Sequence, residues 1–153
     1  MNITMRQAAS ADVPEIVAML ADDPLGARRE NPADQAPYRA AFERIAADPN
    51  QLLFVAEDAD DPAAGIVGTL TLAVLHTLSR QGASRALVEA VRVRSDARGG
   101  GLGTELMKLA IEEARGRGCA LVQLTSDVTR LEAHRFYERL GFEATHLGFK
   151  MEL

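Results

Sequence analysis

A chain of 153 residues, 47% of them hydrophobic and 25% charged, has the composition of one globular domain and is short for two, so we expect a single domain over residues 1–153. A net charge of −5, three scattered histidines and one cysteine argue against nucleic-acid binding and a protein metal site, and exclude an internal disulfide. No apolar run nears the ~20 residues of a membrane span, and the start lacks a signal-peptide pattern, so we expect a cytoplasmic protein without membrane contact.

The N-terminal half is predicted to begin with a strand at residues 3–8, followed by a helix that Asp12 is placed to cap. The apolar residues of this helix recur at helical spacing: Val13, Ile16, Val17 and Leu20. Residues 22–37 are rich in proline and charge and have no period, which predicts a mobile loop. A second helical stripe follows at Tyr38, Ala41, Phe42, Ile45 and Ala46, and then two strands at about 51–57 and 65–75.

The C-terminal half contains an apolar strand, Arg85–Val93, that leads directly into a glycine-rich stretch. The helix after the glycines has a buried stripe of Leu106, Met107, Ala110, Ile111 and Ala114. A strand is predicted at 120–125, and then a helix marked by Ala133, Phe136, Tyr137 and Leu140. Gly141 is placed to end that helix in the left-handed conformation with Phe142 folding back, and residues 143–153 can supply one or two last strands.

The glycine-rich stretch RSDARGGGLGTELM runs from Arg94 to Met107, between a predicted strand and a predicted helix. The first amides of a helix have no carbonyl partners within it, and glycine lets a phosphate approach the backbone closely. A pyrophosphate site is therefore predicted, with a flexible turn as the alternative. The P-loop and dinucleotide-binding patterns both fail, because Thr104 and Glu105 follow Gly103 and no glycine spacing completes GxGxxG. A nucleotide-binding protein is accordingly disfavoured.

The spacing Arg98-x-x-Gly101-x-Gly103 resembles the signature of the GNAT family of acetyl-CoA-dependent N-acetyltransferases. LVEAVRVRSDARGGGLG is similar to the family's fourth strand and its pyrophosphate loop, and AHRFYERLGFEATH to its last helix and following strand. RQAASADVPEIVAML is similar to its usual opening. The resemblance implies an α/β (α+β) fold with a mixed, mostly antiparallel central sheet, flanked by helices and splayed between the fourth and fifth strands.

The resemblance also implies where acetyl-CoA binds. The backbone of Val91 and Val93 would pair with the pantetheine arm. The pyrophosphate would lie on the amides of the loop: Arg98, Gly99, Gly100, Gly101, Leu102, Gly103 and Thr104. Arg92, Arg94 and Arg98 gather positive charge beside this loop in an otherwise acidic protein, although arginines on a strand edge are often merely solvated.

Two residues are candidates for the chemistry. Tyr137 occupies the place of the family's usual general acid, which protonates the departing thiolate; its alternative is a core tyrosine. Glu89 interrupts an apolar strand, and strict alternation puts it on one face with Leu87, Val91 and Val93 unless a bulge intervenes. Desolvation there would raise the pKa of its carboxyl group and suit a general base, direct or through water. The alternative for Glu89 is a structural ion pair with Arg92 or Arg85.

Three other residues carry weaker expectations. His134 is more typical of a surface position than of a proton relay, and Arg130 occupies the place where the family often has a cofactor-contacting asparagine. Cys119 is expected to be a structural thiol, which disfavours an acetyl-cysteine route.

The acceptor is expected to be a small-molecule amine, bound by residues around 22–38, 76–84 and 143–149, as the resemblance implies. The acidic residues of the first segment, Asp22, Asp23, Glu30 and Asp34, could draw a cationic amine, or could simply be solvated. Protein or peptide amines remain open as acceptors, as does a non-catalytic acyl-CoA-binding regulatory module, which would need neither Glu89 nor Tyr137. Homodimers are common in the family, so a homodimer is a further possibility.

Overall fold

The computed structural model describes residues 2–153. It divides into two compact units, one extending to Gln123 and the other formed by Leu124–Leu153, and each unit is described by itself. No helix within residues 2–153 is long and apolar enough to cross a membrane.

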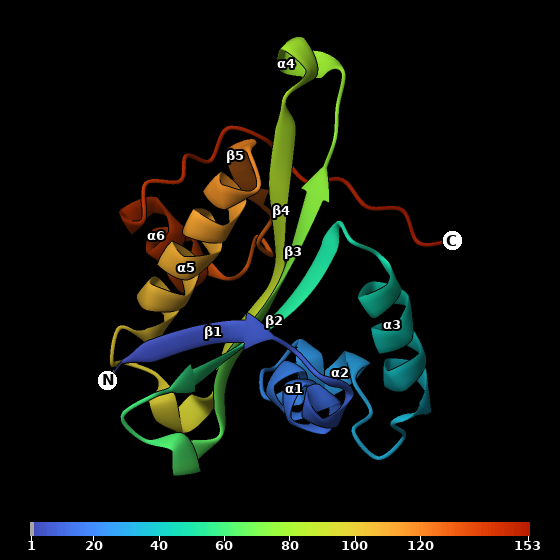
Figure 1. Ribbon diagram of the computed structural model, residues 1–153, viewed down its shortest axis with the longest axis vertical. Coiled ribbons are helices and arrows are strands. Elements are labelled where there is room, and N and C mark those ends of the chain that lie inside the picture. Colours follow the sequence, from blue (N-terminus) through green and yellow to red (C-terminus); the bar gives the residue numbers. More distant parts are fainter. Residues whose placement is uncertain (1) are drawn as a thin grey trace. The chain divides into compact units, whose positions relative to one another are not determined.

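The first unit is built on a sheet with the strand order β1-β2-β3-β4-β5 (Figure 1). The strands are β1 (Ile3–Gln7), β2 (Gln51–Asp58), β3 (Ile66–Leu75), β4 (Ser84–Val93) and β5 (Cys119–Leu124). The first four strands pair antiparallel, and β5 runs parallel to β4 after the crossover helix α5 (Leu102–Gly116). The predicted mixed, mostly antiparallel sheet flanked by helices is therefore confirmed.

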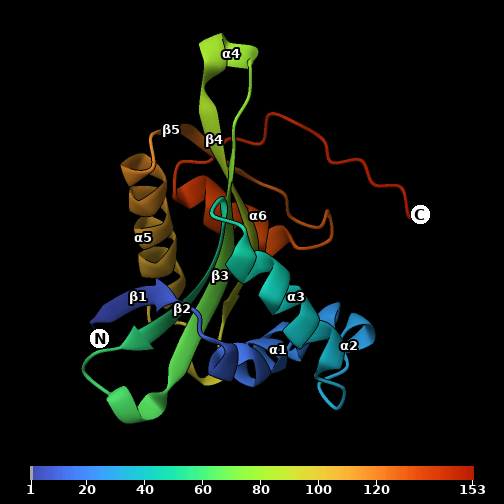
Figure 2. The ribbon, with the colours of Figure 1, turned by 45° about the vertical axis from the view of Figure 1, so that its right-hand side comes forward.

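Helices cover both faces of this sheet, with α5 on one face and the N-terminal helices on the other (Figures 1 and 2). The latter are α1 (Val13–Ala21), α2 (Gly26–Arg29) and α3 (Ala36–Ala47). Helix α4 (Ser79–Gly82) lies at the tip of the β3–β4 hairpin, and short 3₁₀ turns occupy Ser10–Asp12, Pro62–Ala64 and Ser95–Ala97. The predicted helices and strands of this unit are present with their ends shifted by one to a few residues.

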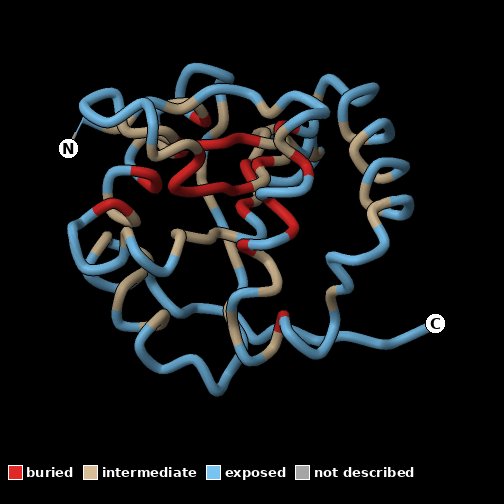
Figure 3. The backbone as a smooth tube through the Cα atoms, turned by 90° about the horizontal axis from the view of Figure 1, so that it is seen from below, coloured by how far each residue is buried: buried red, intermediate tan, exposed pale blue. Residues whose placement is uncertain are grey.

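The hydrophobic core lies between the sheet and these helices (Figure 3). On the α1 face, Ile16 and Met19 pack with Val55 and Ile66. On the α5 face, the approach is close at Gly68, where an added Cβ would lie 3.2 Å from a methyl group of Leu106. The sheet thus packs on both faces against apolar helix stripes, and in α1 the buried stripe includes Met19, which the predicted stripe did not contain.

Two predictions for the N-terminal half need correction. Asp12 is the N-cap residue of α1, as predicted, but its side chain makes no capping hydrogen bond, because its carboxylate reaches back to accept a hydrogen bond from the Ala9 amide (2.7 Å) across a 3₁₀ turn. The segment 22–37 is not wholly irregular, since α2 forms within it. Here Asp23 Oδ1 accepts a hydrogen bond from the Gly26 amide (2.6 Å), and the absence of a side chain on Gly26 allows its backbone to lie against the end of α1.

The second unit contains helix α6 (Leu131–Arg139), which ends as predicted. Gly141 has φ 96°, and the amides of Gly141 and Phe142 donate to the carbonyl oxygens of Glu138 and Tyr137 (3.0 and 3.1 Å). The prediction of further strands at 143–153 is wrong, because no strand forms in that described segment. Its apolar residues alternate and are exposed: Leu147, Phe149, Met151 and Leu153. Alternation supplies an apolar face, but a strand also needs a partner for its backbone hydrogen bonds.

The Asp12 carboxylate also forms an ion pair with Arg6 (2.7 Å), and this hydrogen bond holds the pKa of Asp12 below its ordinary value of 3.8. A carboxyl group with a lowered folded-state pKa stabilises the fold above its unfolded pKa, and this contribution is lost as the pH falls through the folded value. We expect Asp12→Asn to cost at most about 1 kcal/mol at pH 7, because Arg6 is partly exposed, and to cost progressively less below pH ~4. Urea unfolding of the wild-type protein and of Asp12→Asn, from pH 7 to below pH ~4, measures the difference in the free energy of unfolding. A difference that does not change with pH would contradict the expectation.

Candidate functional site

The glycines of the loop between β4 and α5 leave its backbone uncovered before the helix. Gly99 and Gly101 have φ values of 88° and 80°, and a Cβ built on either would meet nothing within 4 Å. Gly101 is the N-cap of α5 and has no side chain to occupy the helix start. The first intrahelical hydrogen bond runs from the Glu105 amide to the Gly101 carbonyl (3.1 Å), so the amides of residues 102–104 precede it. These amides are suited to an anion because of their partial positive charge.

Strand β4 carries a bulge just before this loop. Arg92 pairs with Thr69 and Glu89 with Thr71, so two residues of β4, Ala90 and Val91, stand opposite Leu70 alone. Ala90 has φ 52°, a left-handed value that is uncommon for alanine. Such a bulge bends the strand and interrupts its pairing, and bulges are frequent beside active sites.

Because of the bulge, the predicted assignment of β4 side chains to the two faces of the sheet is wrong. Val93 pairs with Gly68, on the face that packs against α5, whereas Glu89 pairs with Thr71 on the opposite face. Strict alternation put Glu89 and Val93 together, and the extra residue separates them. Because of the same shift, Glu89 shares its face with Arg92, toward the N-terminal helices.

Glu89 is exposed. The desolvation that the sequence pattern suggested for its carboxyl group is therefore not present in this structure. Of its two expected ion-pair partners, Arg92 lies 3.1 Å from Asp23 and Arg85 donates to the Gln123 side chain (3.0 Å). The roles of Glu89 as a base or as an ion-pair partner stay predictions.

The three arginines near the loop all contact protein groups. Arg92 Nε lies 3.1 Å from Asp23 Oδ2, with both side chains mostly buried, and Arg92 Nη1 donates to the Val91 carbonyl (2.9 Å). Arg98 donates from Nε to the Val93 carbonyl (3.1 Å) and lies 3.6 Å from the carboxylate of Asp22. The remaining arginine, Arg94, donates to the Ile66 carbonyl and to Asp96, which holds it toward the start of β3.

Sequence reasoning missed these partners of Arg92 and Arg98. Asp22 and Asp23 were expected to draw a cationic acceptor or to be solvated, whereas their charges are offset by two arginines that lie far away in the sequence. Nothing in the local sequence signals this pairing, because it depends on the path of α1 across the sheet.

Tyr137 lies on α6, in the second unit, and is half-buried. Its ring makes edge contacts with Phe136 and Phe142, with centroids 5.1 and 5.9 Å away. The first unit thus brings Glu89, the bulge, Arg92 and the glycine loop together along β4, whereas Tyr137 belongs to the second unit.

The weaker candidates have local roles. His134 Nε2 lies 2.7 Å from the Asp127 carbonyl oxygen, which can only accept, so Nε2 carries the proton and ties α6 to its preceding turn. Arg130 is the exposed N-cap residue of α6. Burial raises the pKa of the Cys119 thiol, which disfavours the thiolate needed for an acetyl-cysteine route.

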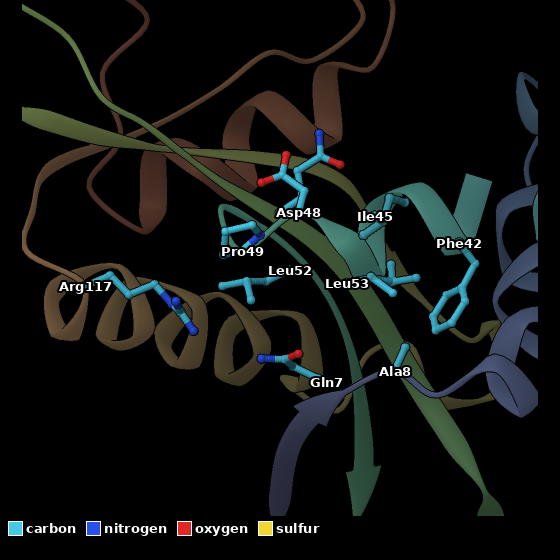
Figure 4. Close-up of a pocket in the computed structure, with 11 residues that line it drawn as sticks. Gln7, Ala8, Phe42, Ile45, Asp48, Pro49, Leu52, Leu53 and Arg117 are labelled. Carbon is cyan, nitrogen blue, oxygen red and sulfur yellow. The ribbon is translucent and has the colours of Figure 1, made fainter. Parts of the chain in front are cut away.

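Two of the pockets in the first unit differ in their distance from the glycine loop. One, of about 240 Å³, is lined by α3, the start of β2 and Arg117, with Phe42 and Leu53 on its walls (Figure 4). Arg117 follows the C-terminal end of α5, roughly 20 Å along that helix from the glycine loop, so this pocket is remote from the loop. The other, of about 480 Å³, is lined by α1 together with Ile66, Arg94 and Ser95, and therefore borders the segment that leads into the loop.

A mixed sheet with a bulged fourth strand, followed by a glycine-capped helix start, defines an α/β protein whose glycine loop has amides suited to an anion. Residues 14–142 match the sequence model of the acetyltransferase (GNAT) family, and the chain belongs to this family. The family resemblance predicted from the loop and its flanking segments is confirmed.

The chain is similar to known proteins over most of its length. A crystal structure of a transcriptional regulator from Bacillus halodurans C-125 is 44% identical with a TM-score of 0.92, and the match covers 99% of this chain and 100% of that one. An aminoalkylphosphonate N-acetyltransferase of Salmonella typhimurium is 29% identical over 97% of this chain and 90% of its own length. A glucosamine 6-phosphate N-acetyltransferase of Oryza sativa is 34% identical over 72% of this chain and 65% of its own.

Proposed function

We propose that the protein transfers the acetyl group of acetyl-CoA to the primary amine of a small molecule, by direct attack in a ternary complex. The observation that carries this proposal is the glycine loop, Arg98–Thr104, at the start of α5 in a chain of the acetyltransferase family. We further propose that the whole chain acts as one acetyltransferase domain, because the family match at 14–142 crosses the boundary between its two compact units.

Acetyl-CoA fits this loop in two respects. Its pyrophosphate needs close approach to backbone amides, and the space beside Gly99 and Gly101 is open where a side chain would otherwise stand. In this proposal the amides of residues 98–104 hold the pyrophosphate, and the backbone of Val91 and Val93 pairs with the pantetheine arm. The guanidinium of Arg98 is half-exposed and adds positive charge, whereas that of Arg92 is mostly buried against Asp23.

The chemistry requires a proton acceptor and a proton donor. An alkylammonium with a pKa near 10.4 needs about 4 kcal/mol to reach its neutral form at pH 7, and we assign the uptake of this proton to Glu89, directly or through water. The exposure of Glu89 favours the route through water. As the amine nitrogen bonds to the acetyl carbon, the carbon–sulfur bond breaks, and Tyr137 donates its phenolic proton to the departing thiolate.

The acceptor class is supported by the names of the relatives. Aminoalkylphosphonate and glucosamine 6-phosphate are both small amines that carry a phosphorus-containing acid group. A small primary amine of this kind is accordingly the first acceptor to test, ahead of protein or peptide amines.

A second candidate function follows from the structure of the Bacillus halodurans protein, which is described as a transcriptional regulator. Its identity of 44% favours a non-catalytic acyl-CoA-binding regulatory module as the alternative. Such a module needs the glycine loop but neither Glu89 nor Tyr137.

The deciding experiment follows acetyl-CoA consumption by thiol release across a panel of amines, with CoA binding measured separately by calorimetry. The panel contains aminoalkylphosphonates, amino sugar phosphates, polyamines and peptides. Turnover on one amine class supports the enzyme and identifies its acceptor. Binding of CoA without turnover on any amine supports the regulatory module, and absence of CoA binding contradicts both.

The loop itself can be tested with Gly101→Val. A β-branched residue at φ 80° is strained, and its side chain would stand in the open space beside the loop. We expect the Kd for CoA to rise by about 10–100-fold, as expected for the loss of one or two hydrogen bonds to a charged group. Gly118→Val is the matched control, because Gly118 has φ 76° and equally open surroundings but precedes β5. Equal loss of affinity in both variants would contradict a pyrophosphate site at the loop.

A further inference from the structure

The guanidinium of Arg92 joins two parts of the first unit that are distant in sequence. One contact is made to its own strand, from Nη1 to the Val91 carbonyl in the bulge (2.9 Å). The other is made from Nε to Asp23 Oδ2 (3.1 Å), just after the end of α1. The second oxygen of Asp23 accepts a hydrogen bond from the Gly26 amide (2.6 Å) at the start of α2. A single side chain therefore connects the bulge of β4 with the turn between α1 and α2.

Burial distinguishes this pair from its neighbour. The side chains of Arg92 and Asp23 are 12% and 16% exposed, whereas those of Arg98 and Asp22 are 51% and 49% exposed. An exposed pair is screened by water and contributes little, but removing one partner of a buried pair leaves a charge without compensation. The connection between β4 and residues 22–30 is therefore carried mainly by Arg92 and Asp23.

Stability alone does not explain such a pair. Two buried charges can often be replaced by apolar groups without loss of stability, because their desolvation offsets their attraction. What the pair provides is a fixed position for the planar Arg92 guanidinium, which donates a hydrogen bond from Nη1 to the Val91 carbonyl while Nε lies within ion-pair distance of Asp23 Oδ2.

We propose that Arg92 and Asp23 are positioning residues, which couple the cofactor strand to residues 22–30 on the acceptor side. This inference rests on the proposed function, in which the β4 backbone holds the pantetheine arm, and on the family resemblance, which implies that residues around 22–38 are among those that contact the amine. Binding of the cofactor to the β4 bulge restrains the Val91 carbonyl, and Arg92 transmits this restraint through Asp23 to the first turn of α2. Glu89 lies on the same face as Arg92, so an amine delivered by this segment meets the proposed base.

Hydrogen–deuterium exchange with and without saturating CoA tests the coupling without requiring turnover. In the wild-type protein we expect CoA to slow exchange in the loop at 98–104 and, by about fivefold or more, in residues 22–30. In Asp23→Asn the loop should still respond, while the response of residues 22–30 should fall below about twofold. The double variant Asp23→Asn/Arg92→Met removes both charges, so that no buried charge is left without its partner. In this variant, too, the response of residues 22–30 to CoA should fall below about twofold, and it keeps the test open if Asp23→Asn folds poorly.

The matched control is Asp12→Asn, which also removes a carboxylate that pairs with an arginine and accepts a backbone amide, but beside β1. It should leave both responses to CoA unchanged. Where an acceptor amine is known, Asp23→Asn should lower kcat/KM for the amine by about 10–100-fold while changing the Kd for CoA by less than about threefold.

The outcomes separate the two proposals. A wild-type loop that does not respond to CoA contradicts the proposed function. A loop that responds while residues 22–30 do not respond in the wild type overturns the positioning role alone. So does a response of residues 22–30 in Asp23→Asn and in the double variant that is as large as in the wild type.

Discussion

Replacing Tyr137 by phenylalanine should lower kcat for acetyl transfer by about 10²–10⁴-fold, the usual contribution of a general acid. The departing thiolate would then leave without its proton donor. The substitution removes only the hydroxyl group, because phenylalanine preserves the edge contacts of the ring with Phe136 and Phe142. The expected loss is therefore a loss of chemistry rather than of packing.

Steady-state kinetics on the amine identified by the panel measures this effect, and calorimetry with CoA shows whether binding is retained. The Kd for CoA should change by less than about threefold, since Tyr137 is proposed to act on the sulfur only after attack. Cys119→Ser serves as the control for a covalent route and should retain activity. A kcat for Tyr137→Phe within about threefold of wild type would remove Tyr137 from the mechanism.

Gly26→Ala should lower the free energy of unfolding by about 3 kcal/mol or more, because the added methyl group has no room. A Cβ at this position would lie 1.8 Å from the carbonyl oxygen of Leu20 and 3.2 Å from Asp23 Oδ1. The Leu20 carbonyl belongs to the last turns of α1, so it cannot move without disturbing that helix. We therefore expect α2 to be displaced or unfolded in this variant.

Urea unfolding followed by circular dichroism gives the change in the free energy of unfolding. Gly116→Ala is the matched control, because Gly116 lies within α5 and a Cβ there meets nothing within 4 Å. That substitution should stabilise the protein by up to about 1 kcal/mol through helix propensity. A cost below about 1 kcal/mol for Gly26→Ala would show that the turn relaxes easily.

The secondary structure could be predicted where the signal is local. The apolar stripe of α5 and the glycine stop of α6 depend on residues within one or two turns, and both are present. The tail at 143–153 has a local strand pattern and no strand, because pairing depends on another segment and not on the tail itself. Asp12 shows the same limit at short range, since a 3₁₀ turn redirects its carboxylate to Ala9.

By itself, the sequence determined the strands and longer helices of the first unit, the glycine-rich character of the Arg98–Thr104 loop and the family resemblance, because each of these is a property of contiguous residues. Only the tertiary structure decided that Glu89 and Arg92 share a face of β4, since one extra residue opposite Leu70 reverses the alternation. It also decided that Arg92 pairs with Asp23. That contact arises where α1 ends beside β4, and a charge pattern read along the chain has no means of showing which distant segments pack together.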